Sequence, residues 1–112
     1  MGTILRIPAE GNGILLAGIT VPVGETYRVV SMTLALNVAA TTSENLTVAL
    51  DAVEGANYDV VLYSVDLSAG AIIDLLWQPD EPLYIIGGDR LGVGWANSNS
   101  RTWGLLLTVE VV

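Results

Sequence analysis

Acidic side chains are the most numerous residues able to perform chemistry in this 112-residue sequence, which has twelve Asp and Glu residues and no histidine or cysteine. Histidine is the commonest general base, so no serine here has the usual partner that activates a nucleophile. Asp80, Glu81 and Asp89 lie in adjacent predicted loops and offer the oxygen ligands that Ca²⁺ prefers, but without EF-hand spacing. The sequence therefore predicts no catalytic residues, no metal site and no cofactor.

Aromatic residues are the best candidates for ligand binding. Trp77 and Tyr84 flank the sequence QPDEP, residues 78–82, whose prolines predict a break between two short strands. Their rings are candidates for stacking on sugars, as in carbohydrate-binding β-sandwich modules. A carbohydrate-binding module, with Trp77 and Tyr84 facing the ligand, is therefore the alternative function.

The charge and hydrophobic content narrow the classes of partner. The net charge is −8, so the chain lacks the basic surface needed to bind nucleic acid or an anionic membrane. The residues are 52% hydrophobic and only 14% charged, below the usual charged fraction of about a quarter. A large core explains this composition in part. Apolar surface covered by another chain, in a homo-oligomer, explains it more fully.

The positions of apolar residues predict strands throughout, with no sustained 3.6-residue period. In residues 26–38, the even positions from Val30 to Val38 are expected to face the core. We predict one all-β domain over residues 1–112, an antiparallel β-sandwich of jelly-roll type with about eight strands; an immunoglobulin-like sandwich is the second choice. The predicted strands span residues 3–8, 13–23, 26–38, 45–53, 58–67, 71–77, 82–86, 90–97 and 102–111, with a helical turn as an alternative around 68–75. The predicted core residues are Leu34, Leu36, Val48, Trp95, Trp103 and Leu105.

The strand RLGVGWA, residues 90–96, has one face with large side chains and one face with almost none. Glycine in a strand often marks the close approach of another layer, although a bulge is an alternative explanation. Residues 58–67 are apolar on both faces, which in a small antiparallel protein favours an outside partner. We therefore predict subunit packing through Val61, Tyr63, Val65, Gly92, Gly94 and Ala96.

Two stretches resemble known families. GGDRLGVGWANSNSRTWGLLLTVEV, residues 87–111, is similar to the closing hairpin of tumour-necrosis-factor and C1q-like jelly rolls. ENLTVALDAVEGANYDVVLYSVDL, residues 44–67, with the overall layout of residues 25–112, resembles small tailed-phage capsid decoration (cement) proteins. The hairpin positions that match are Gly88, Asp89, Trp103, Gly104, Leu105 and Leu106.

The resemblance to decoration proteins implies a non-enzymatic structural protein, commonly trimeric. Such a protein is made in the host cytoplasm, binds the major capsid protein on the outer capsid surface and stabilises the virion shell. With this resemblance, the carbohydrate-binding alternative would lie on a phage fibre or tail. Another head–tail or tail component is a further alternative, which predicts a ring order other than three. Many decoration proteins have a flexible N-terminal arm. Residues 1–13 are short and strand-like here, so we favour a first strand in the chain's own sheet over an arm added to a neighbour's sheet.

Overall fold

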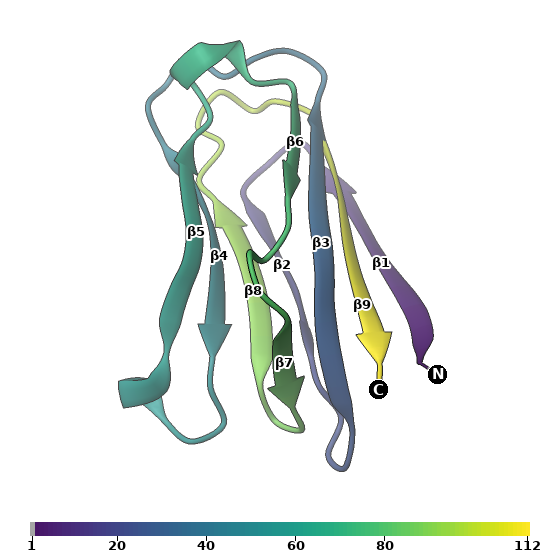
Figure 1. Ribbon diagram of the computed structural model, residues 1–112. Coiled ribbons are helices and arrows are strands. Elements are labelled where there is room, and N and C mark those ends of the chain that lie inside the picture. Colours follow the sequence, from purple (N-terminus) through teal and green to yellow (C-terminus); the bar gives the residue numbers. More distant parts are fainter. Residues whose placement is uncertain (1) are drawn as a thin grey trace.

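The computed structural model describes residues 2–112, which form two antiparallel β-sheets packed face to face (Figure 1). Both sheets bury the apolar side of an alternating pattern against each other, as expected of a β-sandwich. Sheet A contains, in spatial order, β1 (Thr3–Gly11), β9 (Trp103–Val111), β3 (Thr26–Leu36) and β6 (Asp74–Trp77), with β7 (Leu83–Ile86) also paired to β3. Sheet B contains β2 (Leu15–Thr20), β8 (Arg90–Trp95), β4 (Asn45–Asp51) and β5 (Val60–Asp66).

The strand pairing is nested from the two ends of the chain inward. β1 pairs with β9, β2 with β8, β3 with both β6 and β7, and β4 with β5. Further pairing of β3 with β9 and of β4 with β8 closes this long hairpin into two layers, sheet A with five strands and sheet B with four. Such a rolled-up hairpin is the jelly-roll topology, so the predicted fold class is confirmed. Residues 3–11 pair within the chain's own sheet.

Residues 2–112 contain nine strands, two of which share one position in sheet A. β6 and β7 lie one after the other beside β3, separated by the loop that contains Pro79 and Pro82 (Figure 1). Proline has no backbone N–H to donate to a strand ladder, which interrupts the pairing here. Two 3₁₀ turns also form, η1 (Ala56–Tyr58) and η2 (Ala69–Ala71), the second inside the region where a helical turn was an alternative. Within the described residues, no helix is long and apolar enough to cross a membrane.

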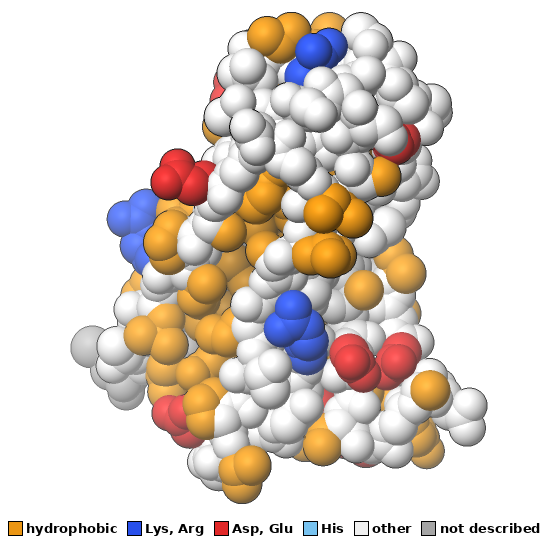
Figure 2. All heavy atoms as spheres, turned by 180° about the vertical axis from the view of Figure 1, so that it is seen from behind, with side chains coloured by type: hydrophobic (Ala, Val, Ile, Leu, Met, Phe, Trp, Pro, Cys, Tyr) orange, Lys and Arg blue, Asp and Glu red, His pale blue; other side chains and the backbone are white. Residues whose placement is uncertain are grey.

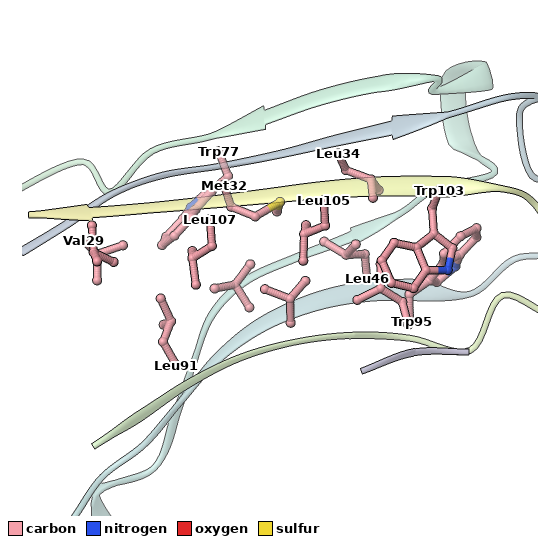
Figure 3. Close-up of a cluster of buried hydrophobic side chains, with 14 of the residues drawn as sticks. Val29, Met32, Leu34, Leu46, Trp77, Leu91, Trp95, Trp103, Leu105 and Leu107 are labelled. Carbon is pink, nitrogen blue, oxygen red and sulfur yellow. The ribbon is translucent and has the colours of Figure 1, made fainter. Parts of the chain in front are cut away.

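The core lies between the sheets and contains every residue predicted there. Leu34, Leu36, Val48, Trp95, Trp103 and Leu105 are all buried. Figure 3 shows Leu105 and Leu107 pointing from β9 toward side chains of sheet B, such as Leu46 and Leu91. Each fully buried side chain of this size contributes about 1.5–3 kcal/mol relative to exposure. The Trp103 indole N–H also donates to the Gly13 carbonyl oxygen at 3.0 Å, which fixes the chain between β1 and β2.

A β-bulge changes which residues of β3 face the core. The register with β9 shifts between Val29 and Ser31, so Val30 is the extra residue. Tyr27 and Val29 are buried before the bulge, and the even positions from Met32 to Leu36 are buried after it. The expectation that Val30 faces the core in phase with Met32 is therefore wrong, because an inserted residue reverses the alternation. Val38, expected to face the core as well, is exposed and lies beyond the end of β3.

Candidate interaction surface

The outer face of sheet B carries an apolar groove. Its floor comes from the centre of the sheet, where Gly92 and Gly94 of β8 pair with Ala49 and Thr47 of β4. Its walls are the neighbouring strands, and the hollow has a volume of about 450 Å³. Leu16 on β2 is one wall and is 74% exposed. We call this surface the glycine groove and define it by Leu16, Thr47, Ala49, Val61, Gly92 and Gly94.

Nothing within residues 2–112 requires glycine at the floor of this groove. A methyl group added at Gly92 or Gly94 lies 3.9 Å from its nearest neighbours, which is ordinary van der Waals contact. Neither residue has a positive φ. Gly18 on β2 differs, because its φ is +156° and an added Cβ overlaps the Leu91 carbonyl oxygen. The pairings of β8 with β2 and with β4 show no register shift, so the bulge explanation for Gly92 and Gly94 does not apply.

Strand β5 contributes one of its three predicted interface residues to the groove. The register between β4 and β5 shifts between Val48 and Ala49, which makes Leu62 an extra, bulged residue on β5. Val61 therefore lies opposite Ala49, on the outer face. Tyr63 and Val65 lie across from buried residues of β4 and pack against the core. Their predicted position on the same outer face as Val61 is wrong, because the bulge at Leu62 reverses the alternation.

Gly92 and Gly94 lie at the floor of the glycine groove, and Ala96 is exposed just beyond the end of β8. Other large apolar side chains, such as Ile14 and Val60, are also exposed. Seen from behind (Figure 2), apolar side chains gather over the side where β1 and β2 lie, with few charged groups between them. Such patches on a folded chain mark interaction surfaces.

The two candidate ligand-facing aromatics lie on opposite faces of sheet A. Trp77 is only 9% exposed and belongs to the core. Tyr84 on β7 is 57% exposed and lies opposite Arg28 of β3 in the strand register. Trp77 as a freely exposed sugar-stacking residue is therefore wrong: its position on the inner face of β6 directs the indole between the sheets. A platform built from both rings does not form.

Charged groups lie at one end of the glycine groove. Asp51 of β4 pairs in register with Arg90 of β8, and Asp59 lies beside them. One Asp59 carboxylate oxygen accepts the Ala52 N–H at 2.8 Å, which holds the turn after β4. The groove is therefore apolar along most of its length and polar at the end where β4 ends and β8 begins.

The acids considered as calcium ligands do not converge. Asp89 is buried, and its two carboxylate oxygens accept the N–H groups of Val53 at 2.8 Å and Ile86 at 2.9 Å. These bonds tie the turn before β8 to the turn after β4. Asp80 and Glu81 lie in the loop between β6 and β7. Within residues 2–112, no three His, Cys, Asp or Glu side chains are grouped to hold a metal ion.

No protein-family model matches the sequence, and no curated protein matches it significantly. The glycine groove is therefore identified as a candidate site by its geometry alone. Its floor was indicated by the alternation in residues 90–96, whereas Leu16 was missed because its cross-strand neighbour Gly94 is far away in the sequence.

Proposed function

We propose that this chain is a non-enzymatic accessory structural protein of a virus particle. Copies assemble into a ring of three through the glycine groove, and the ring binds the major capsid protein on the outer surface of the shell. The ring order and the shell partner follow from the resemblance to tailed-phage decoration proteins. A stiff β-sandwich with large contact faces suits a clamp between shell subunits.

The observation that carries the proposal is the room above Gly92 and Gly94. The described part of their own chain does not fill this space, and it leaves room for a methyl group at either position. Leu16 and Val61 stand exposed on either side, so a side chain from another copy entering the groove would be covered by apolar walls. A closed ring buries such patches in every copy and does not propagate into a fibre.

The jelly-roll topology is compatible with this role and also with lectin domains. Fold alone does not assign function. The glycan-binding alternative depended on two exposed aromatic rings, and Trp77 is buried. The acidic surface, with a net charge of −8, favours a protein that stays away from the packaged genome.

The role on the particle is tested on the virus that encodes the chain. Density-gradient centrifugation should place the chain in the particle band, in a fixed ratio to the major capsid protein measured by quantitative mass spectrometry. Particles assembled without the chain should lose their genome at a lower temperature, and added native protein should restore the release temperature. A chain found only in the soluble fraction, or particles equally stable without it, would contradict the proposal.

The matched variants are Gly94→Ala and Gly94→Leu. The alanine methyl fits within the chain, whereas a leucine side chain fills the groove. Particles lacking the chain should be rescued by Gly94→Ala and not by Gly94→Leu. Equal rescue by both would show that the groove has no part in the shell function.

A further inference from the structure

The outer face of sheet A carries a second and larger hollow. It has a volume of about 850 Å³ and lies over the middle of the sheet. Its floor is made by Gly104 of β9 and Ala35 of β3, which pair with each other across the strands. A methyl group at Gly104 would meet nothing within 4 Å. The hollow is therefore open and shallow on a face that nothing in residues 2–112 covers.

The strand register arranges the residues around this hollow in rows across the sheet. One row is apolar apart from a threonine hydroxyl, and it runs from Pro8 through Leu106 and Thr33 to Leu76. The row on one side of it contains Arg6, Thr108 and Ser31. The row on the other side contains Glu10, Gly104, Ala35 and Asp74.

Opposite charges thus flank the apolar row. Arg6 and Glu10 are both exposed on β1, four residues apart, which is about 14 Å along an extended strand. They are too far apart to pair within one copy. The ion pair that forms in residues 2–112 joins Arg28 to Glu110 at 2.8 Å, so neither Arg6 nor Glu10 has a partner in the described chain.

We propose that this face binds the same face of a second copy around a two-fold axis. The axis lies between the two faces and is parallel to the row that contains Leu106, so it is perpendicular to the strands. Rotation about it reverses the strand direction and keeps each strand over its own counterpart. Arg6 then lies over Glu10 of the second copy, and Glu10 lies over its Arg6. The apolar rows meet at the centre, and Thr108 enters the open space over Gly104 of the second copy.

The face, rather than the edge, is the contact surface. β1 is an edge strand of sheet A, and Pro8 in its middle has no N–H to donate to an added strand. Four strands at a spacing of about 4.8 Å and nine residues of β9 at about 3.4 Å each give a face of about 600 Å². This area is at the lower end of standard interfaces, about 600 to 1,000 Å² per partner, so we expect reversible association.

This contact is independent of the proposed function, because the glycine groove lies on the other sheet. If the groove joins three copies, each ring presents three sheet A faces, so the contact links rings and the mass rises above that of one ring as the protein concentration rises. On a shell, it would link neighbouring rings across two-fold positions. If the groove joins no copies, the same contact makes a simple dimer.

Charge reversal provides the test, by sedimentation equilibrium of the full chain at low salt over a range of concentrations. Arg6→Glu and Glu10→Arg each place like charges in contact twice per two-fold contact, and each should raise the dissociation constant about tenfold or more. The double variant restores both pairs in the opposite sense and should return to within about threefold of native. Single variants that associate like native, or a double variant no better than either single, would overturn the contact.

Two controls separate this contact from other effects. Glu54→Arg makes the same charge change in an exposed loop away from sheet A and should leave the dissociation constant unchanged. Gly94→Leu leaves the sheet A face intact, so its mass should still double with concentration, and adding Arg6→Glu should abolish that doubling. Doubling in Gly94→Leu that is insensitive to Arg6→Glu would contradict the sheet A contact and leave the glycine groove proposal untouched.

Discussion

The rings of Tyr63 and Trp77 stack with their centroids 6.1 Å apart and their planes inclined by 24°. Tyr63 belongs to β5 of sheet B and Trp77 to β6 of sheet A, so the contact joins the ends of the two sheets that lie farthest from β1 and β2. Aromatic pairs of this geometry add about 0.5–1.5 kcal/mol beyond the burial of their surface. The pair closes the sandwich on the side where the edge strands are β5 and β6.

Replacing Trp77 should therefore destabilise the fold. Trp77→Ala removes a buried indole and the stacking partner of Tyr63, and we expect a loss of about 3 kcal/mol in the free energy of unfolding. Tyr84→Ala, on the exposed face of the same sheet, should change it by less than about 0.5 kcal/mol. Urea unfolding followed by tryptophan fluorescence measures both, and equal losses would contradict the placement of Trp77.

The glycines of β2 and β8 should respond differently to the same small substitution. Gly18→Ala puts a Cβ into the Leu91 carbonyl oxygen at a φ that side chains avoid, so we expect a loss of about 2 kcal/mol or more. Gly94→Ala meets ordinary contacts and reduces the freedom of the unfolded chain, so stability should stay the same or rise by about 0.5 kcal/mol. Urea midpoints of the two variants that shift together would contradict this difference.

Acid should weaken the loop contacts of Asp66. Hydrogen bonds from the Ser43 hydroxyl and from the hydroxyl and N–H of Ser68 hold the pKa of Asp66 below the ordinary aspartate value of 3.8. A lowered pKa in the folded state stabilises the fold above pH 3.8, and this contribution is lost as the pH falls through the lowered value. Asp66→Asn should thus be less stable than native at pH 7, with a smaller difference at about pH 2.5. Thermal unfolding at both values checks this, and an unchanged difference would exclude the carboxylate as the cause.

Alternation of apolar residues predicted the fold class and the core because burial is a property of each strand's own sequence. In β9, Trp103, Leu105 and Leu107 follow a period of two without interruption, and all are buried. The bulges at Val30 and Leu62 were not predicted, because an extra residue is defined by the partner strand. Tyr63 and Val65 were assigned to the wrong face for this reason.

The surfaces depend on register between distant segments, which one sequence does not specify. Leu16 lies beside Gly94, and Pro8 beside Leu106, only because β2 pairs with β8 and β1 with β9. The glycine floor was visible in the sequence, whereas the walls of the groove and the rows of sheet A were not. The loop prolines around residues 78–82 correctly predicted a break but gave no sign that Trp77 faces the core.

The most direct test of the account is the mass of the protein in solution, by light scattering behind a sizing column. At about 0.5 M salt and low protein concentration, the sheet A contact is weakened because its charge pairs are screened, so the glycine groove should set the mass. Native protein and Gly94→Ala should show three times the chain mass of 11.8 kDa, and Gly94→Leu a single chain with an unchanged β-sheet circular dichroism spectrum. A native monomer at every concentration, or a Gly94→Leu variant that assembles like native, would contradict assembly through the glycine groove.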